Sequence, residues 1–309
     1  MPSLPLQRIF AMITRHLFCT AFIAATLAGS TVYAEEVKIP AQPLDARLRA
    51  KLPAEILATG EMTAANNGSF PPYTIVTGNQ SMAGASADFI KALSEILGVK
   101  INLAPVNGLS GLLLGIKSGR YQFSMGPIGD FVDREASVDF IDFVQEYVVF
   151  AIPKGNPKGI NGLEDTCGSK VAVMAGGSAE KVIRQQSIAC TTANKPAVEV
   201  QAYADQPTSI LAVNAKRADT FFSSHAPLTY FVQQANGTLE LTGIGKKNGF
   251  DDLYQGAVVQ KGSVLGDVIL EAVRKLNGNG TYAIIMKKWG LSDNMLKTPG
   301  ANLAGKLAK

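Results

Sequence analysis

Two cysteines, Cys167 and Cys190, are the residues whose type and spacing point most directly to chemistry. In an oxidising compartment, an isolated pair at this separation forms a disulfide. A zinc site is an alternative, but it needs further Cys or His ligands, and His225 is the only histidine after residue 34. A catalytic thiol is the other alternative. We predict the Cys167–Cys190 disulfide, and we expect no metal and no cofactor.

A glycine-rich run, Gly176-Gly177-Ser178, precedes a segment, 178–186, that we predict to be a helix. The N-terminus of a helix offers unpaired N–H groups and a partial positive charge, so it can bind a carboxylate. Ser178 is the expected N-cap, and its hydroxyl could also donate to a ligand. The alternative is that the run only caps the helix.

The first 34 residues differ from the rest of the chain. They contain Arg8 and Arg15, no acidic residue, an apolar run over 17–28 and an ending in Val32-Tyr33-Ala34. This pattern is typical of a cleaved secretory signal, and the apolar run is shorter than the roughly 20 residues that span a bilayer. We therefore predict a signal peptide over 1–34 and an exported protein, in which the disulfide would form.

The composition is that of a globular protein. The chain has 309 residues, of which 47% are hydrophobic and 17% charged, and its net charge is +4. These values fit one large domain or two of ordinary size, and they exclude a disordered chain, a coiled coil and a collagen. The basic residues are scattered, so nothing in the sequence indicates a nucleic-acid partner.

Segments with strand and helix patterns alternate from residue 55 onward. Apolar residues form a helical stripe over 86–97, and a strand-like alternation follows over 99–106. The same succession restarts after residue 160, with strands at 170–174 and 197–203 around the helix at 178–186. Such alternation predicts an α/β protein in which crossover helices join parallel strands.

Two extended apolar segments, 147–155 and 254–262, resemble each other, and both end in Lys-Gly. If both cross between two lobes, the chain forms a cleft with a hinge at its base. If both are buried strands of one sheet, there is no such hinge. The pattern alone does not decide between the two interpretations.

Across residues 55–291 the sequence resembles the periplasmic solute-binding proteins of ABC importers, in the polar amino acid group known as family 3. No single motif carries the resemblance, which lies in their order and spacing. The motifs are Asn67-Gly-Ser-Phe-Pro-Pro-Tyr73, Ala87-Asp-Phe-Ile-Lys-Ala-Leu93, Lys117-Ser-Gly-Arg-Tyr121, Asp133-Arg-Glu135, Val138-Asp-Phe140, Gly162-Leu-Glu-Asp165, Lys170-Val-Ala-Val173, Gly176-Gly-Ser178, Arg217-Ala-Asp219, Gly280-Thr-Tyr282 and Lys287-Lys-Trp-Gly290.

The resemblance implies the two-lobed periplasmic-binding-protein fold of type II, an α/β fold in which two crossing strands join two Rossmann-like lobes. Lobe 1 would comprise 35–151 and 257–309, with a mobile tail after residue 295, and lobe 2 would comprise 152–256. We therefore expect a periplasmic monomer without catalytic residues. It would capture a small carboxylate-bearing solute, an amino acid or a similar compound, and deliver it to an inner-membrane ABC permease that it contacts transiently.

Arg134 occupies the position at which the family holds the arginine that grips the ligand's carboxylate, and a planar guanidinium suits that role. Without the resemblance, it would be interpreted as a surface arginine between two acidic neighbours. The resemblance also places the backbone N–H of Gly129 on this carboxylate, although many relatives have Ser or Thr there. Gly177 and Ser178 would bind the carboxylate from the other lobe.

Phe70 and Leu109 stand where the family lines its cleft with large side chains. Phe70 would stack against the ligand. Leu109 replaces the Trp or Phe of many relatives, which implies a roomier wall. Tyr73 is expected to belong to the core or the rim.

Two positions depart from the amino acid binders of the family. Ser224 stands where those proteins hold a carboxylate that pairs with the ligand's ammonium group, and Asn67 stands at a second acidic position that some relatives use. A buried ammonium without an anionic partner is destabilised by several kcal/mol. Either Asp130 or Glu146 supplies the missing charge, or the ligand has no ammonium group. His225 is a further candidate contact.

The main alternative is an enzyme on the same fold, a cyclohexadienyl or prephenate-type dehydratase. Its chemistry would need a general acid in the cleft, for which Glu146, Asp130 and His225 are the candidates. A receptor domain that feeds a signalling kinase is a third hypothesis.

Overall fold

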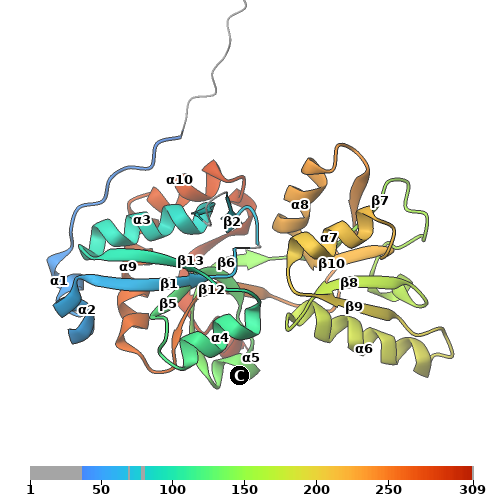
Figure 1. Cartoon of the computed structure of the whole chain (residues 1–309), viewed down its shortest axis with the longest axis horizontal. Helices are drawn as coiled ribbons and strands as arrows, with labels where there is room; N and C mark the ends of the chain where they lie inside the picture. Colours follow the sequence, from blue (N-terminus) through green and yellow to red (C-terminus); the bar gives the residue numbers. More distant parts are fainter. Residues whose placement is uncertain (1–36, 69, 78–80, 308–309) are drawn as a thin grey trace, which may run out of the picture. The chain divides into compact units, whose positions relative to one another are not determined.

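The computed structural model describes residues 37–307 apart from 69 and 78–80. The predicted signal peptide, 1–34, lies outside the described residues. Two large β-sheets dominate the described part, and Figure 1 shows them side by side, each with its own helices.

The first sheet is built from β1 (Glu61–Asn66), β4 (Lys100–Pro105), β5 (Phe123–Gly129), β6 (Val138–Glu146), β12 (Leu253–Gln260) and β13 (Met295–Ala301). Their order in the sheet is β13-β6-β12-β5-β1-β4. β1 runs parallel to β4 and β5, whereas β12 is antiparallel to β5 and β6. The first sheet is therefore mixed, with a parallel half and an antiparallel half.

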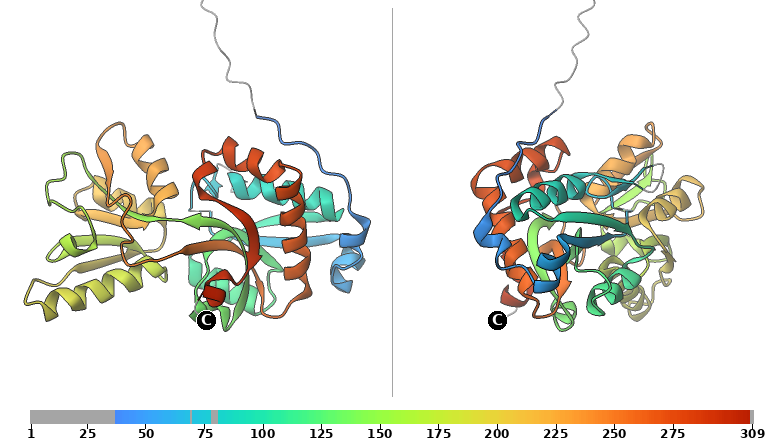
Figure 2. Two further views of the ribbon diagram at one scale, coloured as in Figure 1. Left: turned by 180° about the vertical axis from the view of Figure 1, so that it is seen from behind. Right: turned by 60° about the vertical axis from the view of Figure 1, so that its left-hand side comes forward.

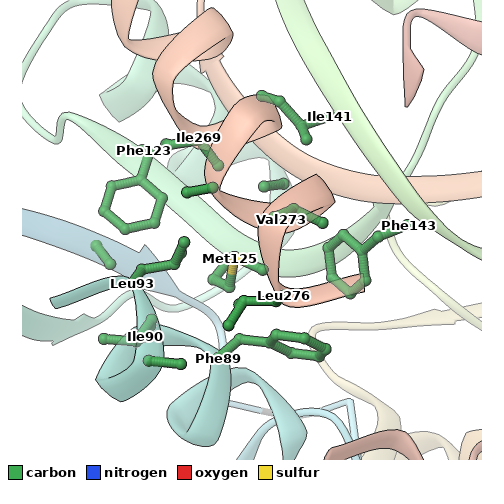
Figure 3. Packing of buried hydrophobic residues seen from close by; sticks show 14 of the residues in the cluster. Phe89, Ile90, Leu93, Phe123, Met125, Ile141, Phe143, Ile269, Val273 and Leu276 are labelled. Atoms are coloured by element: carbon green, nitrogen blue, oxygen red, sulfur yellow. The ribbon is translucent and has the colours of Figure 1, made fainter. Parts of the chain in front are cut away.

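Helices cover both faces of the first sheet because successive side chains of a strand point to opposite sides. In β5, Phe123 and Met125 belong to the larger apolar cluster, and Ile128 belongs to a smaller cluster on the other face. Figure 3 shows part of the larger cluster, where Phe89 and Leu93 meet Phe143 and Leu276. The helices of the larger cluster are α3 (Ala85–Leu97), α9 (Val264–Gly278) and α10 (Thr281–Lys288), and that of the smaller cluster is α4 (Leu109–Lys117).

The second sheet is built from β7 (Val148–Pro153), β8 (Lys170–Met174), β9 (Glu199–Tyr203), β10 (Thr220–Ser224) and β11 (Leu239–Thr242). Their order is β11-β7-β10-β8-β9. One face carries α6 (Ser178–Thr192), and the other carries α7 (Gln206–Asn214) and α8 (His225–Gln234). Each sheet thus has its own core.

The predicted disulfide is confirmed: Cys167 and Cys190 are bonded, and their Cα atoms lie 5.6 Å apart. Cys167 follows the short helix η2 (Leu163–Thr166), and Cys190 lies near the end of α6. The bond therefore ties the last turns of α6 to the chain that enters β8.

The two sheets are joined by two connections, which Figure 2 shows side by side. The chain leaves the first sheet after β6 at Tyr147, and it returns through residues 243–252 to β12. The crossing arrangement is therefore present. We call the first sheet with its helices lobe 1, and the second sheet with its helices lobe 2. The borders expected at 152 and 257 fall inside β7 and β12, so the change of sheet lies several residues earlier in the chain.

The expectation of a mobile tail after residue 295 is wrong for residues 295–307. β13 pairs with β6, and α11 (Leu303–Leu307) follows it. Backbone N–H groups at the start of α11 donate to Asp142, Asp130 and Glu135 at 3.0, 3.0 and 2.7 Å. A segment rich in Lys, Gly and Ala has little apolar pattern, and backbone hydrogen bonds to lobe 1 hold it in place instead.

Short elements complete the described part: α1 (Ala46–Arg49), α2 (Ala54–Thr59), β2 (Ile75–Val76), β3 (Met82–Ala83), α5 (Val132–Glu135) and η3 (Ser292–Asn294). None of the helices in the described part of the chain combines the length and the apolar character of a membrane span.

Candidate functional site

A pocket between the two lobes gathers eight of the residues that the sequence predicts at the ligand site. Both lobes contribute to its walls. The predicted residues that line it are Asn67, Phe70, Leu109, Gly129, Arg134, Gly177, Ser178 and Ser224. The structure brings these positions together from five separate segments of the chain, and their contact with a ligand stays a prediction.

Arg134 lies in the short helix α5, directly after β5 of lobe 1. Its Nη1 donates to the carbonyl of Gly129 at 2.9 Å, and its Nη2 donates to the carbonyl of Gly176 in lobe 2 at 3.2 Å. The guanidinium also lies over the Phe131 ring, 5.0 Å from its centre. Burial lowers the pKa of Arg134, although an arginine remains protonated in a protein.

The charge of Arg134 is not neutralised by an ion pair within the part of the chain that the structure describes. Its direct neighbour Asp133 pairs instead with Lys181 of lobe 2, at 3.3 Å. A guanidinium that is held by carbonyl groups keeps a positive field at the pocket wall. That field favours an anionic ligand, and a carboxylate matches the planar group best.

Gly129 has a steric reason to be glycine. A Cβ built at this position would lie 2.5 Å from Cε2 of Phe131 and 3.5 Å from Nη1 of Arg134. The Ser or Thr of many relatives would therefore collide with the ring that lies beneath the guanidinium. Phe131 was missed from the sequence, because its role depends on this close approach.

The loop before α6 forms the facing wall in lobe 2. Gly177 is the N-cap of this helix and Ser178 is its first residue, so the expectation that Ser178 caps the helix is wrong by one position. The backbone N–H of Gly176 donates to Glu180 at 2.8 Å and that of Gly177 to the carbonyl of Met174 at 3.2 Å, and the N–H groups of the first helical turn have no intrahelical partner, as at any helix N-terminus. The helix still presents its positive end to the pocket, which Gly177, Ser178 and Ala179 line.

Apart from Arg134, the polar side chains of the pocket are uncharged. Ser224 ends β10, and its Oγ accepts a hydrogen bond from Nε2 of Gln255 in lobe 1 at 3.3 Å. Ser223 exchanges hydrogen bonds with Gln206 at 2.9 and 3.0 Å. Among the described residues that line the pocket, none is acidic. Gln255 was also missed, because in the sequence it is only one polar residue in an apolar strand.

Apolar side chains make up much of the remaining wall. Phe70 stacks on Tyr73 with ring centres 5.6 Å apart, and Tyr73 itself is fully buried in lobe 1. The core assignment of Tyr73 is therefore confirmed. Further apolar members, from both lobes, are Leu109, Leu112, Ile128, Met174, Phe250 and Leu253.

Neither of the two acids proposed to replace the missing anion lines the pocket. Asp130 is turned toward the C-terminal segment, where it accepts from the N–H of Ala304, and burial raises its pKa to about 6. Glu146 accepts from the Tyr73 hydroxyl at 2.7 Å and from the N–H of Ala226 at 3.4 Å, and burial raises its pKa to about 7. Both carboxyl groups serve the fold, so that part of the prediction is wrong. His225 is also absent from the pocket walls.

This fold and this pocket define a two-lobed solute-binding protein of type II. Residues 62–292 match the bacterial extracellular solute-binding proteins, family 3, and the chain belongs to that family. The family predicted from the sequence motifs is thereby confirmed.

Similar proteins have names that refer to amino acid ligands. The arginine-binding protein ArgT of Corynebacterium glutamicum is 24% identical over 254 residues, which cover 81% of this chain and 80% of that protein. The L-cystine-binding protein TcyJ of Escherichia coli K12 is 25% identical over 232 residues, which cover 74% and 82%. The solved structure of an ancestral arginine-binding protein bound to glutamine has a TM-score of 0.66 at 25% identity and covers 75% of this chain and 98% of that one.

Proposed function

We propose that this protein is an extracytoplasmic receptor for a small carboxylate-bearing solute, an amino acid or a similar compound. The solute would bind in the pocket between the lobes and be passed to an ABC permease of the inner membrane. The observation that carries this proposal is Arg134, a half-buried cation on the pocket wall that is held by carbonyl groups. Export to the periplasm follows from the predicted signal peptide and agrees with the disulfide.

The ligand's amine is the feature in which this receptor would differ from its relatives. No acidic side chain lines the pocket within the described residues, and an ammonium with only hydroxyl and amide partners does not recover all of its hydration. We therefore propose a solute whose amine is absent, substituted or exposed to solvent, with a modest apolar or hydroxyl-bearing body.

Capture would involve closure of the two lobes. Two contacts across the cleft support this step: Arg134 with the Gly176 carbonyl, and Asp133 with Lys181. The lobes are joined by two short connections, which is the arrangement that permits hinge motion. A bound carboxylate would replace the Gly176 carbonyl as the partner of Arg134 and so link both lobes.

A thermal-shift screen tests the proposal. The panel contains α-amino acids, opines, quaternary amines, 2-oxo acids and aromatic carboxylic acids. A compound at 100 times its Kd stabilises the protein by about 2.7 kcal/mol, which is easily measured. We expect every strong hit to contain a carboxylate. Strong hits without one would contradict the assignment.

The dehydratase alternative has less support from the pocket. Its chemistry needs a general acid beside the substrate, whereas Asp130, Glu146 and His225 all lie outside the walls. Incubation of the purified protein with prephenate, followed by detection of the aromatic product, separates the two functions. Turnover would overturn the receptor proposal.

A further inference from the structure

Gln255 is a buried polar residue in the pocket wall, on strand β12 of lobe 1. The residue is only 5% exposed, and its Oε1 has no hydrogen-bond partner among the described residues. Its Nε2 donates to Ser224 Oγ at 3.3 Å, and in this orientation of the amide the oxygen is the end without a partner. A buried acceptor without a partner destabilises the fold, so this one needs an explanation.

The backbone of β12 is shaped to aim this side chain. Against β6, the pairing shifts register between Gln255 and Gly256, and against β5 it shifts between Gly256 and Val258. Such a bulge re-aims the neighbouring side chain. Gly256 makes the bulge possible, because a Cβ there would lie 2.0 Å from the carbonyl oxygen of Ile141. Gln255 is directed into the pocket by a feature that only glycine allows.

The position of Gln255 in the sheet connects it to the cation. Gln255 pairs directly with Gly129 of β5, and the carbonyl of Gly129 accepts from Arg134 at 2.9 Å. The unpartnered Oε1 of Gln255 and the guanidinium of Arg134 are therefore carried by neighbouring parts of the lobe 1 wall of the pocket. A solute whose carboxylate bound at Arg134 would therefore have the group beside its carboxylate near the part of the wall that Gln255 forms.

We infer that Gln255 is a specificity residue whose Oε1 accepts a hydrogen bond from an uncharged O–H or N–H donor beside the solute's carboxylate. This inference rests on the proposed function. It names the preferred class: acids with a neutral donor, such as 2-hydroxy acids, ahead of the matching 2-oxo acids and α-amino acids. A 2-oxo group presents a second acceptor to Oε1, and an ammonium group needs an anion that this pocket does not provide.

Matched probes test the inference by calorimetry. Each set keeps one body and changes only the group beside the carboxylate: leucine, 2-hydroxy-4-methylpentanoate and 4-methyl-2-oxopentanoate; phenylalanine, 3-phenyllactate and phenylpyruvate; glutamate, 2-hydroxyglutarate and 2-oxoglutarate. The wild-type protein should bind the hydroxy acid of the best set about ten-fold or more tightly than its 2-oxo acid. In Gln255→Met, which keeps the shape of the side chain, that preference should disappear. In Gln255→Glu, the preference should turn toward the α-amino acid.

The outcomes separate the inference from the proposed function. If the probes bind and need Arg134, but Gln255→Met keeps the preference for hydroxy acids, the role of Gln255 is wrong and the receptor proposal stands. The same holds if the wild type prefers the 2-oxo acid, because the amide would then present its N–H to the solute. If no probe and no carboxylate of the wider screen binds, both are wrong. A merely structural role of Gln255 would weaken all three members of a set alike, and this too would overturn the inference.

Discussion

The two lobes differ in the charge of their buried side chains. Within the described residues, all three fully buried carboxyl groups, those of Asp130, Asp142 and Glu146, belong to lobe 1. Lobe 1 also holds Arg134, the cation of the pocket wall. The buried polar side chains of lobe 2 are uncharged, as in Ser223 and Gln206, and its covalent tie is the disulfide.

This difference suggests that the two lobes contribute differently to ligand binding. Lobe 1 would supply the charge that attracts a carboxylate, and lobe 2 would supply neutral donors from a helix N-terminus and from hydroxyl groups. Lobe 1 should also respond to pH, because its buried acids titrate near neutrality. The stability of lobe 2 should instead depend on whether its disulfide is intact. Each expectation can be tested in a separate experiment.

Removal of the cation should have the largest effect. Arg134→Ala should weaken the binding of a carboxylate ligand by about 2–5 kcal/mol, because the bound anion would be left buried without its partner. The free energy of unfolding should change little, since the substitution also removes a desolvated charge. Calorimetry with the best ligand of the screen measures the loss.

Arg47→Ala is the matched control for Arg134→Ala. Arg47 is an exposed arginine of lobe 1 that pairs with Glu271 at 3.4 Å, outside the pocket, so its loss should alter affinity by less than about 1 kcal/mol. Equal affinities of Arg134→Ala and the wild type would show that lobe 1 does not supply the ligand's counter-charge.

The disulfide should give the next largest effect, on stability instead of affinity. Its loop spans a sequence separation of 23 residues, for which the chain-entropy model gives roughly 3 kcal/mol. Replacement of Cys167 and Cys190 by Ser should therefore lower the free energy of unfolding by up to roughly that amount. Denaturant unfolding measures the change.

A thiol titration accompanies this measurement. Exported protein that lacks residues 1–34 should show no reactive thiol after denaturation without reductant. Two reactive thiols per chain would mean that lobe 2 is not braced covalently.

The buried acids of lobe 1 predict an unusual dependence of stability on pH. Burial raises the pKa of Asp142 from 3.8 to about 8, and the proximity of Asp130 adds to the effect. Because the folded protein holds protons that the unfolded chain has released, the free energy of unfolding should fall as pH rises from about 4 to about 8. Asp142→Asn imitates the protonated acid and should reduce this fall by about 1–2 kcal/mol between pH 5 and pH 8.

Denaturant unfolding of wild type and Asp142→Asn at several pH values provides the check. A wild-type protein that becomes more stable between pH 5 and pH 8 would contradict the assignment. The control is Asp133→Asn, an exposed acid in a surface ion pair, which should leave the slope unchanged.

The sequence predicted the features that local pattern and motif position determine. The alternation of strand and helix patterns predicted the α/β class. The pocket residues around Arg134 were predicted from the positions of the motifs, because in this family the same loops come together at the cleft. Features that depend on backbone pairing were missed. The strand at 295–301 has no strong apolar pattern, and the bulge that aims Gln255 becomes visible only when β12 is paired with its neighbours. Likewise, the inward or outward direction of Asp130 and Glu146 is decided by tertiary packing.

Ser224→Asp should have the smallest of these effects, and it tests directly whether the wall of lobe 2 lacks a charge. An aspartate at this position supplies the anion that the pocket lacks, and its oxygen can still accept from Gln255. Affinity for an α-amino acid should rise by about ten-fold, and affinity for the matching acid without an amine should fall by a similar factor through like-charge repulsion.

The matched control for this change is Ser224→Asn, which is similar in size to aspartate and uncharged. Calorimetry on both ligand types, for the wild type and both variants, separates the effect of charge from the effect of size. If Asn and Asp shift the two affinities alike, packing explains the result. If the wild type already binds glutamine or histidine tightly, another group provides the anion, and the contrast between a charged lobe 1 and a neutral lobe 2 does not describe the pocket. A reversal of ligand preference by Asp alone is the outcome that only a missing counter-charge explains.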